Sequence, residues 1–186
     1  PMFIESHRLS HYPERGTDVS VVLDLMIHDI DIILSIVNSK VKKISANGTK
    51  IISSSPDIAN ARIEFDNGCV ANLTASRLSL KKMRKMRIFQ SDSYVSVDFD
   101  KGKAEIVQIT DYDQKDKYAM TLHNSDGIEK EIKVKAIENL NINSIIEEHN
   151  DFSLSIKTNK SPKVPFETGR DALKLAVKIL DEINKK

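Results

Sequence analysis

Asp24, His28 and Asp31 are spaced like neighbours on one side of a helix. They lie within the segment 17–37, in which most other residues are Val, Leu, Ile or Met. An α-helix turns by about 100° per residue, so intervals of four and three residues bring these side chains to the same side. With a threonine and two serines they form a polar stripe about 80° wide, while Asp29 lies on the far side. The segment therefore predicts a helix that is buried nearly all round, with one narrow polar edge.

The chemistry that this polar edge allows is proton transfer. Asp24 and His28 stand four residues apart, where helical side chains meet, so the spacing permits a hydrogen bond between carboxylate and imidazole. The carboxylate would fix the tautomer of the ring, stabilise the imidazolium, and leave the second ring nitrogen to act as a general base or acid. Two interpretations stay open on these residues alone: a catalytic pair, or a contact that satisfies a histidine in a solvated groove.

The sequence predicts no metal site. The dipeptide His28-Asp29 is superficially similar to the signature of the metal-dependent HD phosphohydrolases, but that fold is helical throughout and requires further His and Asp ligands. His7 and His11 have the spacing of metal ligands only within a helix, and Pro13 nearby favours a strand and a loop.

The remaining sequence predicts an α+β domain. Residues 2–10 alternate loosely between apolar and polar types and predict a strand. A loop follows, and Thr17 or Asp18 would cap the long helix, because both residue types accept hydrogen bonds from free amides. From residue 40 onward, β-branched residues come in short runs separated by turn dipeptides.

Asn47-Gly48 and Asn67-Gly68 are the strongest turn signals, since both residue types tolerate positive φ. Two helices are expected after the strands, beginning near Ser144 and Thr168. We therefore expect a mostly antiparallel, open-faced sheet with helices packed on one face.

Composition excludes several classes of protein. The chain has 186 residues, 28 Lys plus Arg, 27 Asp plus Glu and a net charge of +1. This balance argues against nucleic-acid or membrane-surface partners, and no apolar run approaches the roughly 20 residues of a membrane span. A single cysteine, Cys69, cannot form an internal disulfide, so we expect a cytoplasmic protein.

The six glycines are too far apart for a dinucleotide-binding or phosphate-binding loop. We therefore expect no cofactor-binding residues in this chain. The first residue is proline, and the simplest explanation is that the sequence is part of a longer protein.

The segment DVSVVLDLMIHDIDIIL resembles the DxxxHxxD helix that opens the C-terminal domain of the Gfo/Idh/MocA oxidoreductases. The resemblance covers essentially the whole chain. It includes the preceding strand FIESHRL, the strand pair IANARIEFDNGCVANLTASR around an Asn-Gly turn, and the closing helix VPFETGRDALKLAVKIL. It implies a fold like that of the C-terminal domain of glyceraldehyde-3-phosphate dehydrogenase.

In that family an N-terminal Rossmann domain binds NAD or NADP, and the second domain holds the substrate. The resemblance implies that residues 1–186 form one substrate-binding and oligomerisation domain that lacks the Rossmann domain and is inactive alone. The full-length protein would oxidise or reduce a secondary alcohol of a sugar, nucleotide sugar or cyclitol. Asp24 and His28 would be the catalytic residues, and Asp31 would bind a substrate hydroxyl.

Arg8 and Arg15 lie just before the polar helix and could bind an anionic part of the substrate. A guanidinium binds carboxylate or phosphate bidentately, and the diphosphate of a nucleotide sugar is one such group. An ordinary surface role is the alternative for both arginines. The basic segment KKMRKMR, residues 81–87, predicts a solvated strand face, with phosphate binding as the lesser alternative.

The predicted sheet leaves one face open to water or to another subunit. The alternation in ARIEF and VANLTAS would place some apolar side chains there. Since this face often mediates subunit contacts in the resembling family, we expect a homo-oligomer. The competing function is a non-catalytic interaction domain that uses the same face.

Overall fold

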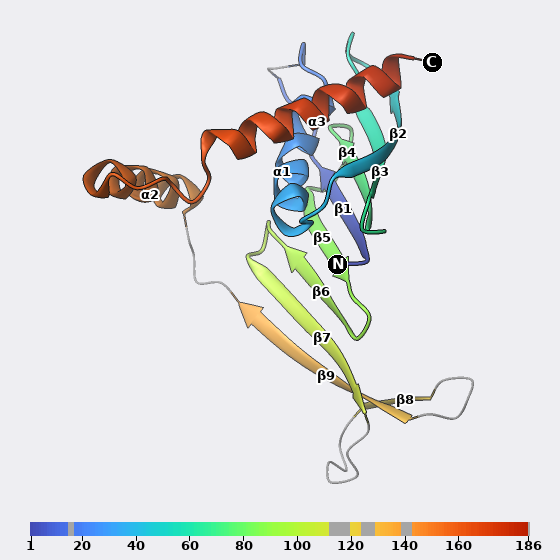
Figure 1. The fold of residues 1–186 in the computed structure, drawn as a ribbon. Helices are drawn as coiled ribbons and strands as arrows, with labels where there is room; N and C mark the ends of the chain where they lie inside the picture. Colours follow the sequence, from blue (N-terminus) through green and yellow to red (C-terminus); the bar gives the residue numbers. More distant parts are fainter. Residues whose placement is uncertain (15–16, 112–119, 124–128, 139–142, 186) are drawn as a thin grey trace.

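The computed structural model describes residues 1–14, 17–111, 120–123, 129–138 and 143–185 (Figure 1). In chain order the elements are β1 (Phe3–Leu9), η1 (Val22–Met26), α1 (Ile27–Ile36), β2 (Val41–Thr49), β3 (Ile58–Phe65), β4 (Val70–Ser76), β5 (Met83–Phe89), β6 (Ser93–Asp98), β7 (Lys103–Asp111), β8 (Met120–His123), β9 (Glu129–Glu138), α2 (Ser144–Thr158) and α3 (Phe166–Asn184). Within the described residues no helix is long and apolar enough to cross a membrane.

All the described strands join in one sheet. Its order is β2-β3-β4-β1-β5-β6-β7-β9-β8. The first strand of the chain, β1, lies between β4 and β5; it runs parallel to β4, whereas the other described strand pairs are antiparallel. The predicted α+β fold with a mostly antiparallel sheet is confirmed.

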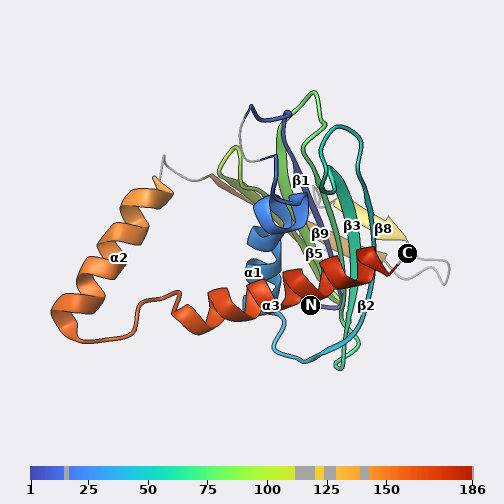
Figure 2. The ribbon, with the colours of Figure 1, turned by 90° about the horizontal axis from the view of Figure 1, so that it is seen from above.

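Helices α1 and α3 lie on the same side of the sheet and pack against each other (Figure 2). The strands beneath the helices carry several small alanine side chains. Because larger side chains would hold the helices away, these alanines let the helices approach the sheet closely. The core is formed by alternate residues of β3 and β4 and by apolar residues of the helices: Ala59, Ala61, Ile63, Phe65, Ala71, Leu73, Ala75, Val22, Met26, Ile30, Ile33, Ala172, Leu175, Ala176 and Ile179.

The two Asn-Gly dipeptides adopt different structures. Asn67-Gly68 forms the predicted turn between β3 and β4, with a φ of 85° at Gly68. The turn predicted at Asn47-Gly48 is wrong, because both residues lie inside β2 and pair with β3. A Cβ atom on Gly48 would stand 3.0 Å from Cγ2 of Ile183 in α3. The absence of a side chain at Gly48 therefore gives room for the close approach of α3 to β2.

Helix α2 stands apart from the sheet in both views (Figures 1 and 2). It is capped by Asn143, whose side chain accepts hydrogen bonds from the N–H groups of Ile145 and Ile146 at 3.1 and 3.3 Å. None of its residues is buried. The expectation that helices pack on one face therefore holds for α1 and α3 and not for α2.

The open face of the sheet is mainly polar over β3 and β4. The alternation in ARIEF and VANLTAS, expected to place some apolar side chains on this face, instead turns Ile63 and Leu73 toward the helices. On the open face, the Asn60 amide donates to Oγ1 of Thr74 at 3.0 Å. Further along this face, Lys85 of β5 forms an ion pair of 3.5 Å with Asp98 of β6. An aromatic cluster of Phe3, Phe89 and Tyr94 ends this surface, with ring centroids 6.2 and 5.6 Å apart.

Candidate functional site

The polar helix starts later than predicted. Its first helical residue is Val21, and Oγ of Ser20 accepts the N–H of Val22 at 3.3 Å, so Ser20 takes the capping role expected of Thr17 or Asp18. The first turn, η1, is a π-helix. Single π turns inside α-helices occur frequently at functional sites. Asp24 lies at the centre of this turn.

The polar edge formed by Asp24, His28 and Asp31 faces solvent. Asp24 and His28 are exposed, and Asp31 is half-buried. Among the described residues no hydrogen bond joins His28 to either carboxylate, so the bond that the spacing permits is not formed in this structure. The Asp24 and His28 side chains are both exposed, so water can hydrogen-bond each of them in place of the other.

Asp29, the residue after His28, points into the protein and pairs with Arg8 of β1. Nε of Arg8 donates to Oδ2 of Asp29 at 3.0 Å, and Nη2 donates to Oδ1 at 2.7 Å. Arg8 is 8% exposed and Asp29 is 3% exposed. Bidentate pairs of this kind fix geometry as well as charge. The pair therefore joins the helix to β1 of the sheet, at the residue next to His28.

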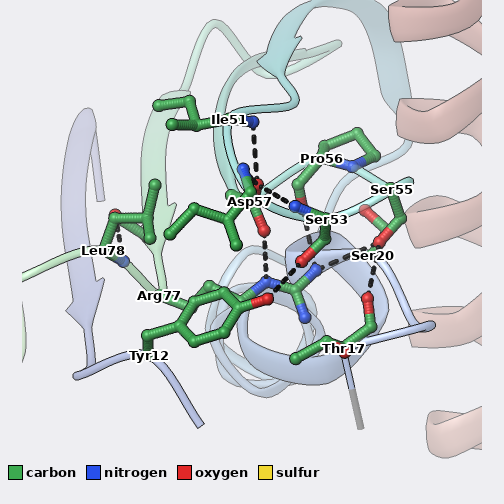
Figure 3. A network of polar contacts seen from close by, with 12 residues as sticks. Tyr12, Thr17, Ser20, Ile51, Ser53, Ser55, Pro56, Asp57, Arg77 and Leu78 are labelled. Carbon is green, nitrogen blue, oxygen red and sulfur yellow. Dashed lines mark hydrogen bonds and ion pairs between the residues drawn. The ribbon is translucent and has the colours of Figure 1, made fainter.

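A second buried ion pair lies near the start of the polar helix (Figure 3). Nε of Arg77 lies 3.1 Å from Oδ1 of Asp57, and neither side chain is exposed. The other carboxylate oxygen accepts the N–H groups of Ile51, Ile52 and Ser53 at 2.8, 2.7 and 2.9 Å. Burial would raise the pKa of Asp57, but these hydrogen bonds outweigh it and hold the pKa well below its usual value.

The Arg77 guanidinium ties the segment before the helix to the loop that precedes β3. Nη2 donates to the carbonyl oxygens of Val19 and Pro56 at 2.6 and 3.0 Å and to Oγ of Ser55 at 3.1 Å. The N–H of Val21 also donates to the Pro56 carbonyl at 3.1 Å. The position of the helix start, and with it Asp24, is therefore set by Arg77.

Sequence reasoning missed Asp29, Asp57 and Arg77 as positioning residues. A signal existed for Asp29, since an acid on the apolar side of a buried helix requires a cation nearby. Asp57 follows a serine-rich loop and a proline, a composition typical of a turn whose amides need an acceptor. No comparable sequence signal marks Arg77.

The other predicted residues divide as follows. Arg8 is positioned by Asp29, and its predicted contact with substrate stays a prediction. Arg15 lies outside the described residues. His28 is exposed whereas Asp29 is buried, so the two side chains point in different directions. Among the described residues no group of three or more His, Cys, Asp or Glu could hold a metal ion. Cys69 is buried, and this burial raises the pKa of its thiol.

Comparison with known proteins decides the family. The model of the GFO/IDH/MocA C-terminal domain matches residues 4–105. The chain belongs to this family. UDP-N-acetylglucosamine 3-dehydrogenase from Acidithiobacillus ferrooxidans is 40% identical to it over 99 residues, which are 53% of this chain and 32% of the relative.

Solved structures agree with the GFO/IDH/MocA assignment. The structure of UDP-N-acetylglucosamine 3-dehydrogenase GnnA from Acidithiobacillus ferrooxidans has a TM-score of 0.82 and 27% identity, and the match covers 98% of this chain and 54% of that one. An NAD-binding protein from Listeria innocua, at 20% identity and a TM-score of 0.73, shares the fold over 99% of this chain and 53% of its own. The chain thus spans about half the length of these solved structures.

Proposed function

We propose that this chain is the substrate-binding domain of an NAD(P)-dependent oxidoreductase that acts on a secondary alcohol of a sugar. A nucleotide sugar is the favoured substrate class, because the relative with 40% identity is a UDP-N-acetylglucosamine 3-dehydrogenase. The observation that carries the proposal is the exposed edge of Asp24, His28 and Asp31 on a helix that two buried ion pairs hold in place. The domain is inactive alone.

In this proposal His28 takes the proton of the reacting hydroxyl as a general base, and returns it when the reaction runs in reverse. The carboxylate of Asp24 stabilises the imidazolium that results, and Asp31 accepts a hydrogen bond from a substrate hydroxyl. Hydrogen bonds of catalytic pairs are often long before substrate binds and tighten in the complex, which accommodates the unbonded Asp24 and His28.

The cofactor is held by a part of the protein outside this chain. The sequence lacks a glycine-rich loop for a pyrophosphate, so its own residues do not fit the dinucleotide backbone. The nicotinamide of NAD or NADP, when bound, accepts the hydride from the substrate carbon. This chain supplies the proton acceptor and holds the sugar.

The two buried ion pairs give the polar edge the rigidity that a proton acceptor requires. A misplacement of about 1 Å can lower a reaction rate about 100-fold. Arg8 fixes the middle of the helix through Asp29, and Arg77 fixes the segment before its first turn. The exposed side chains of the edge therefore project from a backbone with little freedom to shift.

The test is oxidation of UDP-N-acetylglucosamine, free N-acetylglucosamine, glucose and myo-inositol by the full-length protein with NAD⁺ or NADP⁺, followed by absorbance of the reduced cofactor. His28→Ala should lower turnover about 100- to 10,000-fold while cofactor affinity stays nearly unchanged. The control is His149→Ala, which removes an exposed histidine from α2. If the wild-type protein oxidises no substrate with either cofactor, the proposal fails.

We further propose that the chain forms a homo-oligomer through the open face and that the protein is cytoplasmic. Cross-strand ion pairs and the cluster of Phe3, Phe89 and Tyr94 give this face both charge and apolar area. Sedimentation of the full-length protein at micromolar concentration should give a mass above that of one chain. Self-association without oxidation of any sugar would instead favour the non-catalytic interaction domain.

A further inference from the structure

Arg84 lies on a different face of the sheet from Lys85 and Arg87, its neighbours on β5. Side chains alternate along β5, so Lys85 and Arg87 point to the open face, where they pair with Asp98 and Glu5. Arg84 points to the opposite face, together with the core residue Met86. The solvated strand expected for residues 81–87 thus has one arginine on the helix-covered side.

The strand register places Arg84 beside the polar helix. Arg84 stands directly opposite Arg8 in the antiparallel pair of β1 and β5. Arg8 is neutralised by Asp29, the residue next to His28. Among the described residues Arg84 has no side-chain hydrogen bond or ion pair, and it is exposed. The positive charge of Arg84 on β5 therefore lies one strand away from Arg8 on β1, the residue that holds the polar helix through Asp29.

An apolar hollow adjoins Arg84 on the next strands. The N–H of Phe99, just after β6, donates to the Arg84 carbonyl at 2.8 Å. Phe99 is 40% exposed and lines a hollow of about 370 Å³ together with Val97, Ala104 and Ile137. Asp98, Lys103 and Glu138 also line it, and the Lys103 ammonium pairs with the Glu138 carboxylate. Val97 and Ala104 pair across β6 and β7, and Ala104 pairs with Ile137 of β9, so these side chains share one face. Val97 pairs with Met86 of β5, and Met86 lies on the same face as Arg84. The hollow therefore opens on the face that carries Arg84.

We propose that Arg84 and the Phe99 hollow bind the nucleoside diphosphate of a nucleotide-sugar substrate, with the guanidinium on the diphosphate and the base in the hollow. Strands lie about 4.8 Å apart, so the hollow on β6 and β7 begins about 10 Å from Arg8 on β1. The proposal takes a sugar bound at His28 to extend its diphosphate across β1 toward Arg84. This inference rests on the proposed function, because it takes the sugar to be bound at His28.

The contrast between substrate classes strengthens the assignment. A free sugar or a cyclitol carries no charge for Arg84 to bind, whereas a diphosphate accepts a bidentate contact from a guanidinium. An aromatic ring at the rim of an apolar hollow suits a flat heterocyclic base. A nucleotide sugar is the substrate class that uses both features.

The test measures binding of UDP and of NAD⁺ separately to the full-length protein by isothermal titration calorimetry. Arg84→Gln should weaken UDP binding about 10- to 100-fold and leave NAD⁺ binding unchanged, since a lost charged hydrogen bond has an effect of this size. Phe99→Ala should also weaken UDP binding. The matched control is Arg87→Gln on the same strand, which should bind UDP like the wild type. Arg84→Lys should recover part of the affinity, and melting temperatures should establish that each variant is folded.

Kinetics separate the two proposals. If Arg84→Gln raises KM for the nucleotide sugar with little change in kcat, the diphosphate subsite is supported. If UDP binding depends on Arg84 but no sugar is oxidised, the subsite stands and the proposed reaction fails. If a nucleotide sugar is oxidised with the same KM by wild type and Arg84→Gln, the subsite is overturned and the reaction stands. Weaker binding of NAD⁺ rather than UDP would assign the diphosphate to the cofactor and would also overturn the proposal.

Discussion

Asp57→Asn should be among the most destabilising single changes in the chain. The substitution removes the negative charge beside Arg77, a guanidinium with no exposed surface. It also replaces one carboxylate oxygen by an amide NH₂ group, which donates and does not accept. Both oxygens of Asp57 face donors, since Oδ1 faces Arg77 and Oδ2 accepts three backbone N–H groups. Removal of one partner from a buried ion pair costs about 3–5 kcal/mol, a large fraction of the 5–15 kcal/mol by which native proteins are stable.

The pH dependence of this variant supplies a second, independent expectation. The folded-state pKa of Asp57 lies below its unfolded value. Its carboxylate therefore contributes fully to the free energy of unfolding above the unfolded pKa of about 3.9, and this contribution is lost as the pH falls. Between pH 7 and pH 3 the wild type should lose about 1 kcal/mol through this group, and the variant should not. The difference in free energy of unfolding between wild type and Asp57→Asn should therefore be smaller at pH 3 than at pH 7.

Urea unfolding of the full-length protein, followed by circular dichroism at pH 7, 4 and 3, measures both quantities. Asp66→Asn is the matched control, because Asp66 is an exposed acid in the turn after β3. The reasoning is refuted if Asp57→Asn costs less than about 1 kcal/mol at pH 7, the range of an exposed ion pair. A difference between wild type and variant that does not shrink from pH 7 to pH 3 would refute the assigned pKa direction.

Other positions give shorter predictions. Arg8→Met should leave Asp29 buried without a partner and destabilise the protein by about 3–5 kcal/mol in urea unfolding; Arg8→Lys should recover part of the loss, and a variant as stable as wild type would contradict the anchoring role. Gly48→Ala should cost about 1–3 kcal/mol, because its Cβ would press on Ile183. Gly169→Ala in α3 meets no atom within 4 Å and should stabilise by about 0.5–1 kcal/mol, so opposite shifts in melting temperature are expected for the two alanines.

Hydrophobic periodicity was enough to predict the elements that carry the proposed site. The alternation in residues 2–10 and the helical spacing of Asp24, His28 and Asp31 identified a strand and a polar-edged helix that the structure contains. Periodicity alone does not reveal how a helix is wound, so the π turn around Asp24 and the later helix start were missed. The wheel assumes a constant 100° per residue, and the wider turn breaks that assumption.

Tertiary contacts account for the other differences. The same dipeptide, Asn-Gly, forms a turn at Gly68 and a strand at Gly48, and only the approach of α3 distinguishes them. The apolar residues of α2 predicted a helix correctly, but a spacing pattern does not say which surface a helix meets. The pairing of Arg8 with Asp29 depended on two elements whose relative position is fixed only by the folded sheet.

The placement of β1 has a consequence for assembly of the sheet. Strands β2, β3 and β4 form one antiparallel group and β5 to β9 another, and β1 supplies the backbone hydrogen bonds that connect them. A strand from the start of the chain must insert between partners that come 67 to 86 residues later. Such distant pairings form slowly. Deletion of residues 1–9 should therefore leave two separate antiparallel sheets rather than a smaller version of the same sheet, each with a newly bare edge open to aggregation.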